Sequence, residues 1–302
     1  MTGRALVTGA GGFVGRHLVR RLVGDGWDVV GLVRPGAPDL PGATTVGIDV
    51  TDGTATTAAV RAADPDVVLH LAAARAKADA AERAATTAVN TTSGLHVVEG
   101  LTDRCRAVVR LGSSTEYAES AGPMDESTPL HPRGFFGATK AAGSLLVAAA
   151  AAERGVRAAV LRAFQVYGPD DHPGRLVPTV LRAAATGEPL QLTAAGMRRD
   201  WVHVDDVVDA CLRAATADDL PAGTVLNVGT GVQTANEELV AVAEQVTGRR
   251  IDVRTGEHPG RGWDAPSWVS DPTAAHELLG WRATTDLGTG LADCWRAVQE
   301  RV

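Results

Sequence analysis

The stretch RALVTGAGGFVG, residues 4–15, joins a short apolar run to a glycine-rich turn and then to the start of an amphipathic segment. Within it, Gly9, Gly12 and Gly15 form the spacing G-x-x-G-x-x-G. Small residues let the backbone turn tightly and approach a pyrophosphate, which the amides and the positive end of a helix then stabilise. Because the glycines lie between an apolar run and a helical segment, the stretch predicts a dinucleotide-binding loop between a first strand and a first helix.

Apolar runs alternate with helical segments through the first half of the chain. The runs are RALVT (4–8), DVVGLV (28–33), TTVGI (44–48), DVVLHL (66–71), RAVVRL (106–111) and RAAVLR (157–162). Amphipathic or alanine-rich segments separate them, such as FVGRHLVRRLVG (13–24) and ATKAAGSLLVAAAAAERG (138–155). Strands and helices in this alternation form right-handed βαβ units. The predicted fold class is therefore α/β: a Rossmann fold, with a doubly wound parallel sheet and helices on both faces.

The alternation ends near residue 168. Beyond it, glycine- and proline-rich loops separate helical segments near 176–186, 204–217, 236–247 and 287–300, with one more strand, TVLNVG, at 224–229. We therefore predict an NADP(H)-binding Rossmann domain over residues 1–168, to which residues 199–230 return. Residues 169–302 are predicted to form mainly a smaller, substrate-binding lobe.

The composition argues against several kinds of partner. The chain has 302 residues, a net charge of −7 and scattered arginines, so we expect no nucleic-acid partner. Its three cysteines, Cys105, Cys211 and Cys294, are widely spaced, without a C-x-x-C pair or a histidine cluster. This spacing predicts reduced thiols in a cytoplasmic protein and argues against a disulfide framework or a metal site. The N-terminus shows no signal segment, and no apolar run is long enough to span a bilayer, so we expect no membrane partner.

Residues after the second and third apolar runs bear on the type of dinucleotide. An enzyme that prefers NAD often has an acidic residue at the end of the second strand, where it bonds the ribose hydroxyls. Here the positions are Val33 and Arg34, and a guanidinium suits a 2′-phosphate. The sequence therefore predicts NADP(H), with a plain surface role for Arg34 as the alternative. Asp49 and Val50 are candidates for the adenine, although a strand-end aspartate also caps turns.

Motifs along nearly the whole chain resemble those of the extended short-chain dehydrogenase/reductase family. Besides the glycine loop they are HLAA (70–73), Asn90, GSSTEY (112–117), FGATK (136–140), RAFQVYGPDD (162–171), RRDWVHVDDVVDA (198–210), LNVGTG (226–231) and SDPTAAHELLGW (270–281). The resemblance implies hydride transfer between the nicotinamide C4 and a carbon that bears a hydroxyl or keto oxygen. The predicted cofactor-contacting residues are Gly9, Gly12, Phe13, Val14, Gly15, Arg34, Asp49, Val50, Leu71, Ala72, Ala73, Asn90, Lys140, Phe164 and Val166.

The catalytic motif departs from the family at one position. The resemblance implies a Tyr-x-x-x-Lys pair, in which the tyrosine is the acid/base and the lysine holds the nicotinamide ribose. Lys140 keeps its place, but Phe136 occupies the tyrosine position. Ser114, or Ser113 one residue earlier, takes the role of the serine that hydrogen-bonds the substrate oxygen. A positioned general acid/base contributes about 10²–10⁴-fold to a rate, so the loss of the hydroxyl demands an explanation.

Three hypotheses follow from the missing tyrosine. In the first, the chain is still a reductase, and its proton comes from Tyr117, Ser113, Ser114, Thr115, Glu116, His203 or an acidic phenol of the substrate itself. An apolar wall of Phe135 and Phe136 suits a flat aromatic substrate. The chain resembles the tyrosine-lacking polyketide ketoreductases that act on angucyclinones. This hypothesis makes the protein an NADPH-dependent ketoreductase of antibiotic biosynthesis that reduces a carbonyl of a polycyclic aromatic polyketide.

The second hypothesis is a nucleotide-sugar enzyme: a 4-ketoreductase, an epimerase or a dehydratase. Arg199 and Arg261 match family arginines that often contact nucleotide phosphates, and the alternative for both is a structural role in an ion pair or a loop. Gln165 replaces the asparagine usual in this family and argues against it, as does Phe136. The third hypothesis is a non-catalytic protein that senses NADP(H), for which Lys140 and the serine pair are less needed.

Further candidates lie in the C-terminal half. The predicted substrate-contacting residues are Thr115, Tyr117, Phe135, Phe136, Gln165, Arg199, His203, Arg261, Trp263 and Trp268. For Trp263 and Trp268, stacking on an aromatic ligand and a plain core position are both open. Asp205 and Asp206 are interpreted as the N-cap and first-turn charge of a helix, so no metal is predicted. The alanine-rich helix after Lys140 matches one that often joins a two-fold dimer in this family, so a homodimer is possible; burial on the sheet also explains it.

Overall fold

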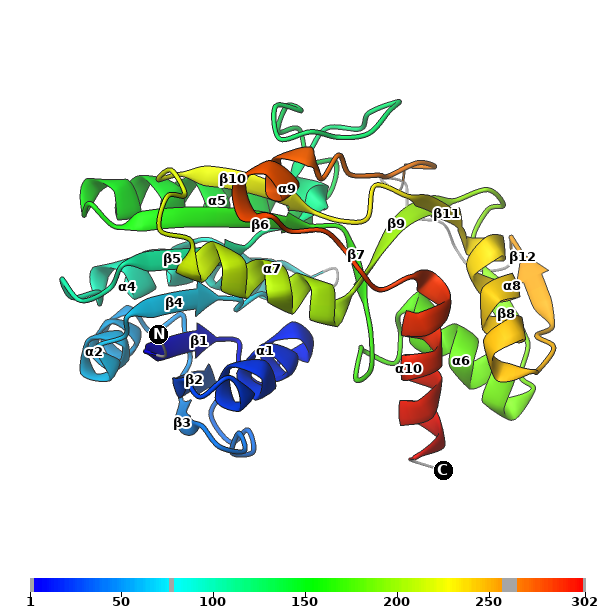
Figure 1. The fold of residues 1–302 in the computed structure, drawn as a ribbon, viewed down its shortest axis with the longest axis horizontal. Helices are drawn as coiled ribbons and strands as arrows, with labels where there is room; N and C mark the ends of the chain where they lie inside the picture. The colour runs from blue at the N-terminus through cyan, green and yellow to red at the C-terminus, as the bar shows by residue number, and fades with distance from the viewer. Residues whose placement is uncertain (1–2, 76–78, 257–264, 301–302) are drawn as a thin grey trace.

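The computed structural model describes residues 3–75, 79–256 and 265–300. Its largest element is a seven-stranded parallel sheet with the strand order β10-β6-β5-β4-β1-β2-β3 (Figure 1). The strands are β1 (Arg4–Thr8), β2 (Asp28–Val33), β3 (Thr44–Gly47), β4 (Val67–His70), β5 (Ala107–Leu111), β6 (Arg157–Ala163) and β10 (Thr224–Val228). The order reverses between β1 and β4. Ligands of such sheets bind at this reversal, outside the carboxyl ends of the strands.

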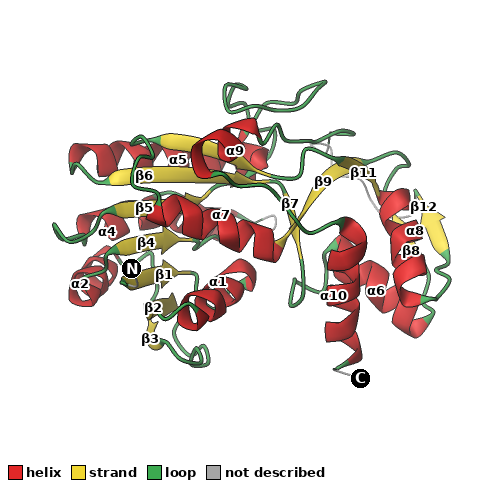
Figure 2. Cartoon of the chain, viewed as in Figure 1, coloured by secondary structure: helices red, strands yellow, loops and turns green. Residues whose placement is uncertain are grey.

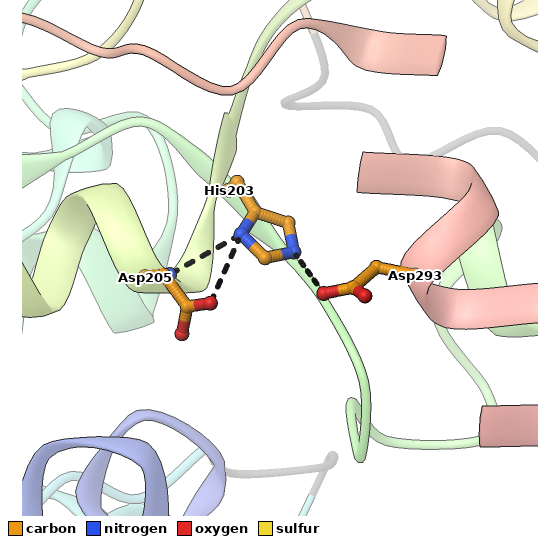
Figure 3. A group of neighbouring side chains, drawn as sticks. All are labelled: His203, Asp205 and Asp293. Atoms are coloured by element: carbon orange, nitrogen blue, oxygen red, sulfur yellow. Dashed lines mark hydrogen bonds and ion pairs between the residues drawn. The ribbon is translucent and has the colours of Figure 1, made fainter. Parts of the chain in front are cut away.

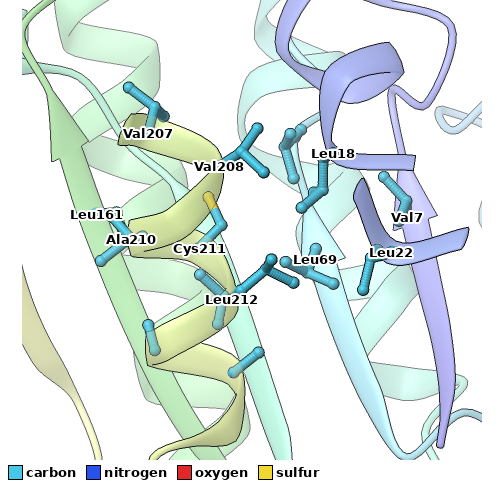
Figure 4. Close-up of a cluster of buried hydrophobic side chains, with 14 of the residues drawn as sticks. Val7, Leu18, Leu22, Leu69, Leu161, Val207, Val208, Ala210, Cys211 and Leu212 are labelled. Atoms are coloured by element: carbon cyan, nitrogen blue, oxygen red, sulfur yellow. The ribbon is translucent and has the colours of Figure 1, made fainter. Parts of the chain in front are cut away.

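Helices cover both faces of this sheet. One face carries α1 (Phe13–Gly24) and α7 (Val204–Thr216), whose apolar residues pack with those of the strands (Figure 4). The other face carries α2 (Gly53–Ala63), α4 (Thr92–Glu99) and α5 (Phe135–Glu153), with α3 (Ala80–Asn90) against α4 and α5. Alternate residues of one strand serve the two cores: Ala5 and Val7 of β1 face α1, and Leu6 faces the opposite layer. The predicted doubly wound Rossmann fold is confirmed.

A smaller lobe begins with β7 (Gln165–Tyr167) and lies beside the main sheet (Figure 2). It has a hydrophobic core of its own. It contains a three-stranded sheet of β7, β9 (Arg198–His203) and β11 (Gln233–Ala235), and a pair of strands, β8 (Leu190–Leu192) and β12 (Val253–Thr255). Its helices are α6 (Leu176–Thr186), α8 (Asn236–Thr247) and α10 (Leu287–Gln299). The chain returns from the lobe to the main sheet twice. In the first return α7 packs on the sheet and β10 joins it, and in the second α9 (Thr273–Leu279) packs against β10.

Helix α5 is long and apolar enough to cross a membrane by length and composition alone. In the structure it packs against α4 and β6 and buries Lys140, as a core helix of this fold does. Its outer side carries Leu145, which is 60% exposed, and Leu146. These exposed leucines accord with a two-fold dimer through α5, which stays a prediction.

Candidate functional site

The glycine loop fits a dinucleotide. Gly9 has a φ of +66°, which favours glycine, and a Cβ there would lie 2.8 Å from the backbone nitrogen of Ala72. A Cβ on Gly15 would lie 2.2 Å from the carbonyl oxygen of Gly9. Gly12 is the N-cap of α1, no side chain caps that helix, and its first turn carries no acidic residue. The first-turn amides, from Phe13 and Val14 onward, are thus available to a pyrophosphate, whose charge suits this end of the helix.

The adenosine side of the loop is more open. Arg34 is exposed just after β2, and its carbonyl accepts a hydrogen bond from the amide of Ala37 in a turn. Asp49 accepts hydrogen bonds from the amide and the hydroxyl of Thr51, at 2.9 and 2.7 Å, and these bonds lower the pKa of its carboxyl. One oxygen of Asp49 therefore caps a turn. Half-buried Val50 is held through its carbonyl oxygen, 3.2 Å from Nδ1 of His96.

The loop after β4 is tied to its surroundings on two sides. The hydroxyl of Thr8 accepts a hydrogen bond from the amide of Ala72, so Leu71 to Ala73 lie beside the glycine loop. The fully buried side chain of Asn90 bonds both the amide and the carbonyl oxygen of Ala74, at 2.9 Å each. Its Nδ2 also donates to the hydroxyl of Thr139 on α5, at 2.9 Å. The side chain of Asn90 therefore fixes this loop against α5, and its predicted contact with the cofactor stays a prediction.

Two of the candidate hydroxyls lie together at the end of β5. Ser113 caps the short 3₁₀ helix Ser114–Glu116, and its Oγ lies 2.8 Å from the hydroxyl of Thr115. Both of these side chains are half-buried, whereas Ser114 is buried. A Cβ on Gly137 would lie 2.1 Å from the carbonyl oxygen of Thr115, so this turn packs tightly on the first turn of α5. Of the two serines left open by the sequence, Ser113 is the more accessible one.

Lys140 and Phe136 lie on the first turns of α5. Lys140 is 3% exposed, its Nζ donates to the carbonyl oxygen of Leu111, and burial lowers the pKa of its ammonium to about 7, with Arg110 and Arg75 adding repulsion. Phe136 is half-buried, and the guanidinium of Arg75 lies over its ring, with Cζ 4.6 Å from the ring centroid. A second stack repeats the pattern, with Cζ of Arg83 5.7 Å from the exposed ring of Phe135.

Two predicted proton donors are buried beneath the site instead of lining it. Tyr117 is fully buried, donates its hydroxyl hydrogen to Asn227 over 2.8 Å, and has its pKa raised to about 12 by burial. Glu116 is also fully buried and pairs with Arg162 at 3.1 Å. Its carboxylate accepts hydrogen bonds from the amide of Ser113 and the hydroxyl of Ser144. These positions argue against a catalytic role for Tyr117 or Glu116, since each side chain is engaged within the core.

His203 lies in a different group of side chains, between the two lobes (Figure 3). Its Nδ1 is 3.8 Å from the carboxylate of Asp205, and its Nε2 is 3.8 Å from that of Asp293 on α10. His17 of α1 reaches the same Asp205 at 3.3 Å, beside a cavity of about 500 Å³. None of the contacts described for His203 involves Lys140 or the serine turn, which argues against its role as proton donor.

The start of α7 also differs from the sequence interpretation. The N-cap is His203, whose Nδ1 accepts from the amide of Asp205, so both aspartates belong to the first turn. Asp206 is buried and accepts hydrogen bonds from Thr284 and Thr285. One ligand atom each from His203, Asp205 and Asp293 lies within 4.8 Å of the others, which a metal site would require. However, His17 already pairs with Asp205 and Arg296 with Asp293, so a structural role suffices.

The C-terminal candidates are divided between core and loop. Phe164 and Trp268 pack with Tyr117 in a small cluster, whereas Val166 of β7 is buried in the core of the main sheet. Gln165 is half-buried and pairs with Trp201 of β9. The guanidinium of Arg199 donates to the carbonyl oxygen of Ala265 over 2.9 Å, and its contact with a substrate stays a prediction. Arg261 and Trp263 lie outside the described residues.

Three residues that shape the site went unnoticed in the sequence. Arg75 lies two residues after the HLAA motif (70–73), and this position is the only hint that the sequence gives of its role. Arg110 is fully buried within β5, where a strand pattern predicts an apolar residue, and burial lowers its pKa to about 10. Asp200 is buried and accepts hydrogen bonds from Thr230, Gly231 and Ser270, which joins β9 to the loops that follow β10 and precede α9.

Comparisons with known proteins agree with this geometry. Residues 5–229 match the model of the NAD dependent epimerase/dehydratase family. A UDP-glucose 4-epimerase of Mycolicibacterium smegmatis is 32% identical over 96% of each chain. A dTDP-6-deoxy-L-talose 4-dehydrogenase (NAD(P)(+)) of Kitasatospora kifunensis is 28% identical over 97% of this chain and 95% of its own. The structure of MoeE5 in complex with UDP-glucuronic acid and NAD superposes with a TM-score of 0.89, at 30% identity over 99% of this chain and 100% of MoeE5.

These relatives confirm the resemblance to the extended short-chain dehydrogenase/reductase family, but they do not support the resemblance to one particular type of ketoreductase within it. They are named for nucleotide sugars, and none of the three supports the resemblance to angucyclinone ketoreductases. They support a nicotinamide dinucleotide as cofactor and an oxidoreductase-type enzyme, without deciding between NAD and NADP. The chain belongs to the NAD dependent epimerase/dehydratase family.

Proposed function

We propose that this protein is an NAD(P)H-dependent ketoreductase that acts on a nucleotide-linked keto-sugar. The observation that carries the reaction type is Phe136 in the place of an acid/base tyrosine, while Lys140 and Ser113 remain. An epimerase or a dehydratase first oxidises an alcohol, and it needs a base for the hydroxyl proton at that step. A reductase only has to protonate an oxygen that hydride addition has already made strongly basic. Loss of the tyrosine therefore harms reduction least.

The residues divide the work as follows. The glycine loop and the first-turn amides of α1 bind the pyrophosphate, and Lys140 holds the nicotinamide ribose. Ser113 orients the substrate carbonyl through its hydroxyl. Thr115 supports Ser113, because the two hydroxyl oxygens lie 2.8 Å apart. When bound, the cofactor supplies the hydride. The relatives named for UDP- and dTDP-sugars support the substrate class, and the 4-dehydrogenase among them performs a single oxidation of the kind reversed here.

A second candidate substrate is a flat aromatic ketone of the angucyclinone type. The observation in its favour is the pair Phe135 and Phe136 at the start of α5, of which Phe135 is 42% exposed. A phenol beside the ketone would pass its own proton to the oxygen that receives negative charge. In that case the enzyme supplies orientation and the hydride donor, and no side chain replaces the tyrosine.

Oxidation of NAD(P)H, followed by absorbance, tests the proposal with two substrate panels. The panels are nucleotide-linked 4-keto-6-deoxysugars and peri-hydroxylated polycyclic quinones. Turnover of the sugars supports the main proposal. Turnover of only the quinones, lost when the neighbouring phenol is methylated, establishes the second candidate. Failure of both panels contradicts the reductase assignment.

We also expect Phe136→Tyr to change turnover by no more than about threefold. The natural residue at this position is Phe136, so the reaction proceeds without a hydroxyl there. A restored general acid contributes about 10²–10⁴-fold only where protonation limits the rate. A gain of that size on either panel shows that the site lacks an acid it needs. Phe135→Tyr, on the exposed neighbour, is the matched control.

Arg34 provides a test of cofactor choice. We propose that its guanidinium binds the 2′-phosphate of NADP(H), since it is exposed directly after β2. Arg34→Asp should then weaken NADPH binding by about tenfold or more relative to NADH, because a charge-assisted bond is replaced by repulsion. Dissociation constants for both cofactors measure this, with Arg61→Asp on the exposed side of α2 as control. An unchanged ratio removes Arg34 from cofactor recognition.

A further inference from the structure

Arg75 is held next to the position where the family has its tyrosine hydroxyl. Its guanidinium lies over the ring of Phe136, with Cζ 4.6 Å from the ring centroid. The loop that carries it is fixed one residue earlier, because Asn90 bonds both the amide and the carbonyl oxygen of Ala74. Asn90 also donates a hydrogen bond to the hydroxyl of Thr139 of α5, three residues after Phe136. One buried amide thus aligns the loop of Arg75 with the helix of Phe136.

The charge of Arg75 acts on titratable groups of two other segments. It disfavours the protonated form of Lys140 on α5, and it lowers the pKa of Asp171, which lies in the loop after β7, against the larger effect of burial. Arg75 also lies just beyond the carboxyl end of β4, at the edge of the sheet where ligands of this fold bind. Its guanidinium therefore lies over the first turn of α5, at the edge of the sheet where ligands of this fold bind.

We propose that Arg75 is a catalytic residue that donates a hydrogen bond to the substrate oxygen as this oxygen gains negative charge, in place of the missing tyrosine hydroxyl. This role rests on the proposed ketone reduction. Hydride adds to the carbonyl carbon, and the electron pair of the C=O π bond moves to the oxygen. The alkoxide is stabilised by Arg75, which stays protonated, and then takes a proton from water. The sum is ketone, NAD(P)H and one proton to alcohol and NAD(P)⁺.

A guanidinium suits this task better than it suits proton transfer. It keeps its charge at every working pH and offers several N–H donors in a plane, so it can stack on Phe136 and still reach an oxygen beside the ring. Donors of this kind, aimed at charge that develops in the transition state, are worth about 10²–10³-fold in turnover. Arg83 offers the matched comparison, because it stacks on exposed Phe135 in the same manner, 5.7 Å from the ring centroid.

The first experiment needs no substrate or cofactor. Phe136→Tyr places a phenol oxygen near the guanidinium, and its ionisation is followed by ultraviolet difference absorbance. The two native tyrosines do not interfere, because burial raises the pKa of Tyr117 to about 12 and that of Tyr167 further still. Adding Arg75→Gln should raise the pKa of the introduced phenol by about one unit or more, since a cation within a few ångströms stabilises an anion. Adding Arg83→Gln should shift it far less. Equal pKa values in the two double variants overturn the proposal.

The second experiment uses the wild-type background and a substrate that it turns over. Arg75→Gln should lower turnover about 100-fold and leave the dissociation constant of NAD(P)H within twofold. Arg75→Lys should recover part of the loss, and Arg83→Gln should match wild type. Full activity of Arg75→Gln overturns the catalytic role, and the proposed function stands. Inactivity of wild type on both panels, with the shift in the phenol pKa intact, means that the proposed function fails while the oxyanion site at Arg75 remains.

Discussion

Glu116→Ala should lower the free energy of unfolding by about 3–5 kcal/mol, because it leaves a buried guanidinium without its partner. Glu116 is fully buried, and its Oε2 lies 3.1 Å from Nε of Arg162, which is 5% exposed. The same carboxylate accepts hydrogen bonds from the amide of Ser113 and the hydroxyl of Ser144. Removal therefore also releases the turn that presents Ser113, and turnover should fall together with stability. Urea unfolding at pH 7 measures the first effect.

Glu119→Ala is the matched control for this prediction. Glu119 also pairs with an arginine, Arg133, but both side chains are 42% exposed, and such surface pairs contribute about 0–1 kcal/mol. The double change Glu116→Leu with Arg162→Met should recover most of the loss, since replacing a buried pair by apolar residues is often close to neutral. If Glu116→Ala destabilises no more than Glu119→Ala, the pair with Arg162 does not hold the turn.

The larger elements of the fold were predictable because their patterns are local. DVVGLV predicts a strand at 28–33, and β2 spans Asp28–Val33. The helix predicted at 204–217 is α7, Val204–Thr216, whose apolar residues recur with the helical period. The three-residue strands β8 and β12 were missed, because a run of that length has no readable period. Their pairing joins segments about 60 residues apart, which depends on the packing of the lobe.

The site was predictable only where the backbone decides it. Gly9 and Gly15 are required by a left-handed φ and by close contacts, and both are visible as a spacing. The burial of the candidate proton donors Tyr117 and Glu116 could not be predicted, because it depends on partners far along the chain, Asn227 and Arg162. Arg75 carries no local pattern at all, because its contact with the ring on α5 exists only in the folded chain.

Lys140→Met should raise the free energy of unfolding by about 1–3 kcal/mol at pH 6.5, even though it removes the residue proposed to hold the ribose. Lys140 is 3% exposed, and burial lowers the pKa of its ammonium from 10.5 to about 7. Below pH 7 the folded protein therefore keeps a cation in a site that disfavours it. Methionine has a similar length and no charge. Turnover and NAD(P)H binding should both fall, so the variant separates stability from function.

The pH dependence identifies the cause. The folded protein releases the Lys140 proton near pH 7, whereas the unfolded chain keeps it up to about pH 10.5. Between these values the unfolded state binds more protons, so wild-type stability rises with pH, by up to about 1.4 kcal/mol per unit from this group. The advantage of Lys140→Met should accordingly shrink between pH 6.5 and pH 9.5 in parallel urea titrations. The buried cysteines contribute equally to the pH dependence of both proteins, so their contribution cancels in the difference. The control is Leu145→Met, at a position on the same helix that is 60% exposed; its free energy of unfolding should equal that of wild type at both pH values. A constant advantage across this range would mean that packing, and not a buried charge, explains the gain in the free energy of unfolding.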